Sequence, residues 1–509
     1  MKKYNIAIFG ASGYIGLALT QHLYQLGHNI SLFVRNKDRV AYLLGADDFN
    51  IYTTPIEKQN IMQLSKDLNN IDVIYYLIHS MEKQTENFLK KDNDVAQIVG
   101  KASFNAKVKQ IIYVGGLGVD DTKHSLSKHL KSRQITAKYL SKYGTPVTEF
   151  RMGIVTGVGS ASFEMIRTLS TKLPFIPQIP FNHGVCQIID IQNVLEYLEQ
   201  ALNNHKYFDK IIEVGTKTAY GYDELIVIYA RMIKSRNIIV LPLPLLQYIF
   251  TEFVIARFIS FFTNMPYKLS RPLIEGMKSL AVVENYPIEE VDNENRVRII
   301  DYAESIIKAS SYRHEIAFES VWQIPIDLQF FLKQNKDELT FAQYKRFGLY
   351  FSSFIVPLKF NDKNIYFNAI KEIIHKSRFE FTKFEEIYLS VVDRLFFREK
   401  LYYTSSSLTL VEGSTCRDWR VVAINENSQY ITISSQFQKV GFLWFQASLH
   451  TEPKTKENYL MLRIFFEPIS IKGHIYWKVV KPFHETILKR LYLRVVGITQ
   501  QKGIKIERD

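Results

Sequence analysis

The first part of the chain alternates between short apolar runs and longer segments of mixed polarity. Helix-length segments such as Gln84–Ala106 and Ser127–Tyr143 separate the runs. Strands that alternate with helices predict βαβ units, and continuous apolar strands fit a parallel sheet that is covered on both faces. The pattern therefore predicts an α/β fold with a doubly wound parallel sheet over residues 1–215. The predicted strands are rich in β-branched and aromatic residues and cover Ile6–Phe9, Ile30–Val34, Val73–Ile78, Ile111–Val114 and Val147–Phe150.

The alternation fades over residues 216–335, which we interpret as a substrate-side extension of the sheet domain. This part contains the apolar segment Ile238–Phe262, which Pro242 and Pro244 interrupt. Its charge-free portion, Ile238–Thr251, is shorter than the roughly 20 residues that a membrane-spanning helix needs. We therefore expect no integral membrane segment and interpret Ile238–Phe262 as a buried or pocket-lining helix. A peripheral membrane contact through the same residues is the alternative.

The final third, residues 336–509, has a different pattern. After a strand at Phe351–Phe360, two helical stretches are predicted at Lys363–His375 and Phe384–Phe397. Five strands with short polar turns follow, at Ser406–Val411, Asp418–Ile424, Gln429–Ser435, Phe442–His450 and Tyr459–Phe466. A long terminal helix is predicted from the helical spacing of Tyr476, Val480, Phe483, Ile487, Leu491 and Val495. This order predicts an α+β helix-grip domain, in which the last helix crosses a curved sheet and can leave an apolar cavity.

The clearest chemical signal is a glycine-rich loop that follows the first strand and begins a helix. A Gly-x-x-Gly-x-x-Gly loop in this position forms a tight turn, lets the backbone approach a pyrophosphate and lets the helix pack closely on the sheet. The helix N-terminus then stabilises the negative charge. We therefore predict a dinucleotide-binding Rossmann domain whose loop consists of Gly10, Ala11, Ser12, Gly13, Tyr14, Ile15 and Gly16.

The end of the second strand bears on the choice between NADP(H) and NAD(H). An acidic residue there would bind the ribose 2′-hydroxyl of NAD. The chain instead has Val34-Arg35-Asn36-Lys37. A guanidinium can pair with a 2′-phosphate in bidentate fashion, so Arg35 favours NADP(H), with NAD(H) as the alternative.

The chain resembles the atypical short-chain dehydrogenase/reductase superfamily, in the branch that includes the NmrA-like proteins. It resembles more closely a bacterial group in which this domain is fused to a C-terminal domain of unknown function related to the START/polyketide-cyclase fold. In the first part the resemblance rests on Gly10–Gly16, Tyr76–Met81, Tyr113–Gly118, Leu126–Arg133, Arg151–Ile154 and Gly157–Met165. In the second part it rests on Asp418–Arg420, Trp444, Tyr476–Trp477 and Pro482–His484. The resemblance implies NAD(P) binding and oxidoreductase activity.

The chain departs from this superfamily at the proton donor. Typical members carry Tyr-x-x-x-Lys on the helix after the fifth strand, whereas the corresponding stretch here is His129-Leu-Lys-Ser-Arg133. His129 is a candidate proton donor near neutral pH, with Arg133 as its electrostatic neighbour. The alternative is that both residues only position the cofactor or cap the helix.

Three further residues follow predicted strands at their carboxyl ends, where open α/β sheets bind ligands. His79 and Ser80 follow the fourth strand and are candidates for contacts with the cofactor ribose or nicotinamide; a role in shaping the loop is the alternative. Gly115 ends the fifth strand, where it would give the cofactor backbone clearance.

Composition limits the other functional classes. The 64 Lys and Arg residues exceed the 51 Asp and Glu residues, giving a net charge of +13 that suits an anionic ligand. The 12 His residues show no clustered spacing, so no metal site is expected. On the predicted last helix, basic residues alternate with the apolar face. This pattern is typical of a solvated helix face, so no nucleic-acid partner is expected. Two cysteines and a short apolar N-terminal run favour a cytoplasmic protein without a signal peptide.

Together these observations predict an NADP(H)-binding oxidoreductase that acts on a small apolar carbonyl or enone. The alternative is a non-enzymatic NADP(H) sensor or a carrier of an apolar ligand, which the missing Tyr-Lys pair favours. Substrate, direction of reaction and oligomeric state do not follow from the sequence.

Overall fold

The computed structural model divides the chain into two compact units, one centred on Met1–Tyr312 and the other on Gln323–Asp509. The structure describes residues 2–35, 37, 40, 49–78, 88–119, 126, 128–172, 175–177, 184–234, 238–241, 253–254, 256–257, 271, 274–276, 279–292, 297–316, 340–346, 349–358, 362–375, 410–411, 413–416, 419–426, 429–435, 440–451, 457–468 and 471–506.

The first unit is built on a seven-stranded sheet with the strand order β3-β2-β1-β4-β5-β6-β11. Every neighbouring pair in it is parallel. The order 3-2-1-4-5-6 is that of a doubly wound nucleotide-binding sheet, so the predicted Rossmann fold is confirmed. Its strands are β1 (Asn5–Phe9), β2 (Asn29–Phe33), β3 (Asn50–Tyr52), β4 (Val73–Tyr76), β5 (Gln110–Gly116), β6 (Val147–Met152) and β11 (Ile211–Val214).

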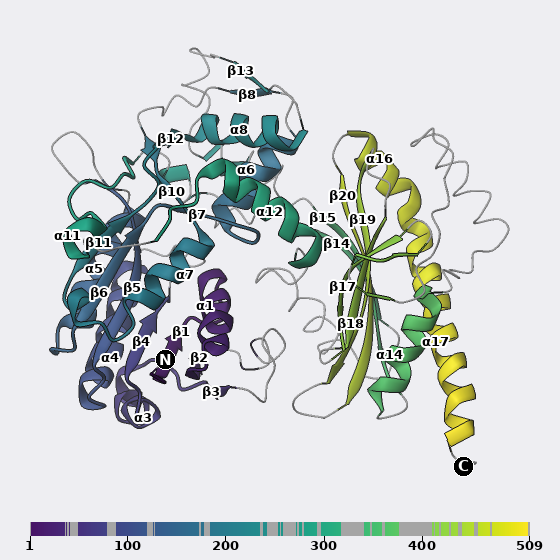
Figure 1. Cartoon of the computed structure of the whole chain (residues 1–509), viewed down its shortest axis with the longest axis horizontal. Helices are drawn as coiled ribbons and strands as arrows, with labels where there is room; N and C mark the ends of the chain where they lie inside the picture. Colours follow the sequence, from purple (N-terminus) through teal and green to yellow (C-terminus); the bar gives the residue numbers. More distant parts are fainter. Residues whose placement is uncertain are drawn as a thin grey trace. The chain divides into compact units, whose positions relative to one another are not determined.

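Helices cover both faces of this sheet (Figure 1). Ile6 and Ile8 of β1 belong to a buried cluster with residues of α1 and α7, whereas Ala7 and Phe9 belong to a second cluster with residues of α3, α4 and α5. Burial on both faces explains why the strands are continuous apolar runs. The covering helices are α1 (Tyr14–Gln25), α3 (Ile61–Asp67), α4 (Phe88–Asn105), α5 (Lys128–Ser141) and α7 (Ile191–Gln200).

Three small strand pairs and further helices extend the first unit. The parallel pairs are β7 with β10 and β8 with β13, and the antiparallel pair is β9 with β12. Some of these elements precede residue 215, so the boundary at 215/216 remains a prediction. The elements are β7 (Ile154–Thr156), α6 (Ala161–Lys172), β8 (Phe175–Pro177), β9 (Val185–Cys186), β10 (Ile188–Asp190), β12 (Tyr220–Gly221), α8 (Tyr222–Lys234), β13 (Ile239–Leu241), α11 (Ile288–Val291) and α12 (Tyr302–Ile316).

The second unit is built on a seven-stranded antiparallel sheet with the order β14-β15-β20-β19-β18-β17-β16. The sequence predicted antiparallel strands here, and four of the five predicted after residue 400 correspond to observed ones. The elements are β14 (Thr340–Arg346), β15 (Leu349–Pro357), α14 (Lys363–His375), β16 (Thr415–Cys416), β17 (Trp419–Asn425), β18 (Tyr430–Ser435), β19 (Gly441–Thr451), β20 (Asn458–Pro468), α16 (Ile471–Val480) and α17 (His484–Ile506).

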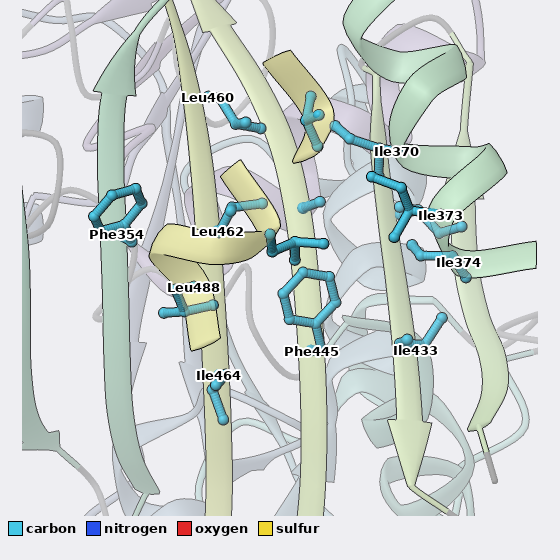
Figure 2. Close-up of a cluster of buried hydrophobic side chains, with 14 of the residues drawn as sticks. Phe354, Ile370, Ile373, Ile374, Ile433, Phe445, Leu460, Leu462, Ile464 and Leu488 are labelled. Carbon is cyan, nitrogen blue, oxygen red and sulfur yellow. The ribbon is translucent and has the colours of Figure 1, made fainter. Parts of the chain in front are cut away.

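One face of this second sheet packs against α14 and α17. Figure 2 shows Ile370 and Ile373 of α14 and Leu488 of α17 beside Phe445 and Leu462 of the sheet. All five side chains are buried, with exposed fractions of 4% or less. Side chains therefore occupy the interface, and the apolar cavity expected for a helix-grip domain remains a prediction.

The predicted single terminal helix is wrong in one respect, because the helix is broken in the middle. A short 3-10 turn, η4 (Lys481–Phe483), separates α16 from α17. Pro482 lies in this turn; it has no backbone N–H and its ring clashes with the preceding helical turn. Two side-chain hydrogen bonds attach the resulting corner to β15: they join Tyr350 Oη to His474 Nδ1 at 2.8 Å, and Ser352 Oγ to His484 Nδ1 at 2.9 Å.

Strand β14 was missed by the sequence interpretation, although Thr340–Arg346 has strand length. The helix predicted at Phe384–Phe397 and most of the strand predicted at Ser406–Val411 lie outside the described residues. So does most of the apolar segment Ile238–Phe262, of which Ile239–Leu241 form β13.

Candidate dinucleotide site

The predicted phosphate loop connects β1 to α1 and depends on glycine in its first position. Gly10 has a φ of +85°, and a Cβ atom there would lie 2.8 Å from the carbonyl carbon and oxygen of Leu77. The N–H of Gly13 donates a 2.9 Å hydrogen bond to the carbonyl oxygen of Gly10, which closes the turn. Only glycine combines this conformation with such close contact.

The third glycine lets α1 pack against the loop. A Cβ atom on Gly16 would collide with the Gly10 carbonyl oxygen and lie 2.8 Å from Cα of Ala11. Ala11 itself is fully buried. Helix α1 is therefore packed closely against the loop, as the sequence predicted for a nucleotide-binding turn.

The N-terminus of α1 has no capping side chain and no acidic residue of its own. Gly13 is the N-cap residue, no side chain caps the helix, and its first turn contains no acidic residue. The first N–H groups of a helix lack intrahelical partners, and the helix dipole favours negative charge beside them. Bare glycine backbone and uncapped amides are what a pyrophosphate requires, so Gly10–Gly16 fit a dinucleotide.

Tyr14 has a different role from its glycine neighbours. A Cβ atom on Gly157, which has a φ of +138°, would collide with the Tyr14 hydroxyl group. Burial raises the pKa of Tyr14, with a further contribution from Asp190. The side chain thus packs against the segment after β7 as a neutral phenol, and only the backbone of Tyr14 belongs to the loop.

Arg35 lies just beyond the carboxyl end of β2 and is exposed. Phe33, the last residue of β2, pairs with Phe9 of β1, and its carbonyl oxygen accepts a 3.4 Å hydrogen bond from the N–H of Gly10. Arg35 is therefore two residues away from a direct contact of the phosphate loop. This is the side of the loop on which the adenosine ribose lies in doubly wound sheets.

Arg133 and Gly115 are brought together at the carboxyl end of β5. The Arg133 guanidinium donates from Nη2 to the Val114 carbonyl oxygen at 2.8 Å, and the Tyr113 hydroxyl donates to the Arg133 carbonyl oxygen at 2.9 Å. A Cβ atom on Gly116 would lie 3.7 Å from Arg133 Nη1. The Nε atom of Arg133 is buried and has no hydrogen-bond partner.

His129 lies in the first turn of α5, one helical turn before Arg133, and its side chain lies outside the described residues. His79 and Ser80 also lie outside them, directly after the described residue Ile78. The roles predicted for these three side chains remain predictions.

Residues 10–156 match a family model described as NAD(P)H-binding. The first unit contains an NAD(P)-binding Rossmann domain. The match covers the phosphate loop, Arg35 and the β5 end, and stops before the second unit. No curated protein matches the chain.

Solved structures with a similar fold include enzymes with different ligands. The WbmG enzyme of Bordetella bronchiseptica in complex with NAD is 13% identical, covering 64% of this chain and 98% of its own, with a TM-score of 0.47. Triphenylmethane reductase of Citrobacter sp. with NADP(H) is 16% identical, covering 60% and 100%, with a TM-score of 0.45. UDP-glucose 4-epimerase of Thermotoga maritima with UDP-glucose is 15% identical, covering 47% and 85%, with a TM-score of 0.38.

A buried charged group beside the β5 end was missed by the sequence interpretation. Glu149 of β6 is 3% exposed, and its Oε1 accepts a 2.9 Å hydrogen bond from Nε of Arg151. A Cβ atom on Gly115 would lie 3.5 Å from the same carboxylate oxygen. Burial raises the pKa of Glu149, although Arg151 and Arg133 oppose the shift. The signal was the two charged residues in Val147-Thr-Glu149-Phe-Arg151, inside an otherwise apolar strand.

Arg151 connects this carboxylate to a second one. Its Nη1 lies 3.7 Å from Oε1 of Glu213 on β11. Oε2 of Glu213 accepts hydrogen bonds from the backbone N–H groups of Glu284 and Asn285 at 2.9 and 3.0 Å. Buried charges are stable only when paired and hydrogen-bonded in this way, so the network joins β6, β11 and the segment before α11.

A hollow of about 860 Å³ lies at the opposite end of the sheet. Asn5, Asn29 and Asn50, which begin β1, β2 and β3, contribute to its polar lining. Ligands of doubly wound sheets bind at the carboxyl ends of the strands. The hollow is therefore separate from the dinucleotide site.

Other chemistries find no support within the described part of the chain. No group of three or more His, Cys, Asp or Glu residues in that part could hold a metal ion. The Cys186 thiol is buried, and burial raises its pKa to about 12, so it is not a ready nucleophile. Among the described helices, none combines the length and hydropathy required to cross a bilayer.

Proposed function

We propose that this protein binds NADP(H) and uses it as an atypical short-chain dehydrogenase/reductase to reduce a small apolar carbonyl or enone. The observation that carries the proposal is the loop Gly10–Gly16, where glycine backbone and the uncapped N-terminus of α1 leave room and N–H donors for a pyrophosphate. The match to an NAD(P)H-binding family model over residues 10–156 supports the class of ligand.

Arg35 supports NADP(H) over NAD(H). It is exposed beside the phosphate loop, and the residues on either side of it in the sequence are not acidic. A carboxylate at this place would repel a 2′-phosphate, whereas the guanidinium forms charge-assisted hydrogen bonds with it.

For the chemical step, the bound cofactor would supply a hydride to the substrate carbon. Residues of the chain must then supply a proton to the oxygen and hold the reacting groups. His129 would donate the proton, because imidazole titrates near neutral pH. Arg133, fixed by the Val114 carbonyl oxygen, would stabilise developing negative charge with its remaining N–H groups. Gly115 leaves backbone clearance at the β5 end, where His79 and Ser80 would border the nicotinamide ribose.

The second unit is proposed to be a START-like helix-grip domain that helps to hold an apolar substrate. Support comes from the antiparallel sheet with α14 and α17 packed on one face. A cytoplasmic location is part of the same proposal and follows from the low cysteine content.

The experiment is a titration of the full chain with NADPH and NADH, followed by 340 nm absorbance measurements with quinones, enones and aldehydes. Tight binding of NADPH with substrate-dependent oxidation is the expected result. Binding without oxidation of NADPH over the whole panel would favour the non-enzymatic sensor or carrier, which the missing Tyr-Lys pair already favours. Absence of dinucleotide binding would overturn both functions.

A further inference from the structure

One stretch of the first unit exposes far more apolar surface than its length warrants. Single exposed apolar side chains are normal on soluble proteins, whereas groups of them mark interaction surfaces. Fourteen large hydrophobic side chains are exposed in the described part of the chain, and five of them lie between residues 232 and 254. We call these five the apolar strip: Met232 (36% exposed), Ile233 (38%), Ile239 (62%), Phe253 (51%) and Val254 (37%).

Neighbouring residues show that the apolar strip is the outer side of an anchored structure. Tyr229 and Ala230 of α8 are buried, whereas Met232 and Ile233 at the end of the same helix are exposed. Ile238 is 6% exposed and Ala256 is fully buried, beside the exposed Ile239 and Phe253 respectively. Figure 1 shows α8 and the β8–β13 pair together at one end of the unit. The inward side chains hold these segments to the unit, and apolar side chains remain on the outside.

In the sequence that contains the apolar strip, basic residues outnumber acidic ones. Between residues 231 and 275, the acidic residues are Glu252 and Glu275, and Glu275 lies 3.3 Å from Arg271 in an ion pair. Arg231 is exposed, and the guanidinium of Arg257 lies 4.6 Å from the centre of the Phe253 ring. The six basic residues in that interval are Arg231, Lys234, Arg236, Arg257, Lys268 and Arg271.

We propose that the apolar strip docks this protein onto the surface of an anionic lipid bilayer. Apolar side chains flanked by Lys and Arg have the composition of segments that lie in the membrane interface, where the chains enter the acyl boundary and the cations meet anionic headgroups. The described helices include none that could cross the bilayer, so the contact is peripheral. The residues of the strip lie on α8, on β13 and at positions 253 and 254 rather than in the phosphate loop, so the proposal is independent of the proposed function.

The test is co-sedimentation of the full chain with phosphatidylcholine vesicles that contain or lack phosphatidylglycerol. Wild type is expected to bind the anionic vesicles, and high salt is expected to weaken the binding. Ile239→Glu and Phe253→Glu should each reduce the bound fraction by about tenfold, because each replaces an inserted apolar side chain with a charge that anionic lipid repels. Met62→Glu is the matched control: Met62 of α3 is 69% exposed and lies outside the strip, so its variant should bind like wild type.

Two results would overturn the proposal. One is a wild-type protein that does not bind anionic vesicles. The other is an Ile239→Glu variant that binds them as well as wild type. If light scattering shows that Ile239→Glu dissociates a dimer and no vesicle binding occurs, the strip is a self-association surface instead. NADPH affinity should be unchanged in Ile239→Glu, which shows that a loss of vesicle binding does not reflect misfolding or failure of the proposed dinucleotide site.

Discussion

The carboxyl ends of β1 and β5 belong to one sheet, yet they are built by different means. At β1 the structure consists almost wholly of backbone: Gly10, Gly13 and Gly16 remove side chains where atoms approach closely. At β5 the important groups are charged side chains, Arg133 from α5 and Glu149 from β6, which meet around Gly115. In the proposed function, the first end would hold the pyrophosphate of any dinucleotide, and the second would determine what chemistry can follow.

This difference explains why the loop at β1 could be predicted whole, whereas at β5 Gly115 and Arg133 were candidates and Glu149 was missed. A backbone site appears in the sequence as an uninterrupted loop, because the turn, the close approach and the helix start are within seven consecutive residues. The β5 end combines residues 115, 133 and 149, which are far apart in the sequence and meet only through parallel pairing of β5 with β6 and packing of α5. No local sequence pattern indicates that these three residues are close in the folded chain.

The largest expected effect is a loss of NADPH affinity when a side chain is added to the phosphate loop. Gly13→Ala places a Cβ atom 3.2 Å from the Gly10 carbonyl oxygen, which a small shift can relieve, and its φ of −82° is ordinary for alanine. The fold should therefore persist, while NADPH affinity falls by about a hundredfold because the methyl group would keep the pyrophosphate away from the loop backbone that it is proposed to approach. Fluorescence titration with NADPH measures the affinity, and a thermal melt measures the fold.

The control for this variant is Gly497→Ala. A Cβ atom on Gly497 of α17 would meet nothing within 4 Å, and alanine favours a helix by about 1 kcal/mol over glycine. It should bind NADPH like wild type. Unchanged NADPH affinity in Gly13→Ala would remove the phosphate loop from the site.

The second effect concerns the β5 end. Arg133→Ala should lower NADPH affinity by about tenfold, corresponding to about 1.4 kcal/mol, because a charge-assisted contact is lost. Where turnover is observed, it should fall more than affinity, and Arg133→Lys should restore part of the affinity but not the bond geometry at the Val114 carbonyl oxygen. Separate measurements of kcat and KM for both variants test this. Equal loss in Arg133→Ala and Arg133→Lys would argue for a purely structural role.

A third effect, similar in size but confined to NADPH and without an expected effect on turnover, concerns the selectivity of the β1 side. Arg35→Ala should reduce the preference for NADPH over NADH by about tenfold, with little change in NADH affinity, because only the 2′-phosphate loses a partner. Parallel titrations with the two nucleotides give the ratio. A ratio equal to that of wild type would mean that another cation recognises the phosphate or that no preference exists.

In the second unit, too, elements with a local sequence pattern were predicted, whereas a feature that involves contacts between distant residues was not. Strands β17–β20 and helix α14 were predicted because each repeats a local pattern. The break at Pro482 was missed, since the apolar spacing continues across it and hides the missing backbone donor. Tertiary contacts accompany the break. Tyr350 of β15 is hydrogen-bonded to His474 before the break, and Ser352 of β15 to His484 after it.

The smallest effect is a change in the pH dependence of stability at the β5 end. Burial raises the folded-state pKa of Glu149 above its ordinary value of 4.5, so the folded protein holds this proton more tightly than the unfolded chain. Stability from this group is then greatest at low pH and declines as pH rises from about 4.5 through the raised pKa. In urea unfolding at a series of pH values, Glu149→Gln should lose that decline, because glutamine does not titrate. Glu289→Gln, an exposed change on α11, should keep it. If wild type and Glu149→Gln have the same pH profile, the pKa of Glu149 is the same in the folded and unfolded states, and the charges of Arg151 and Arg133 offset the effect of burial at this end of the sheet.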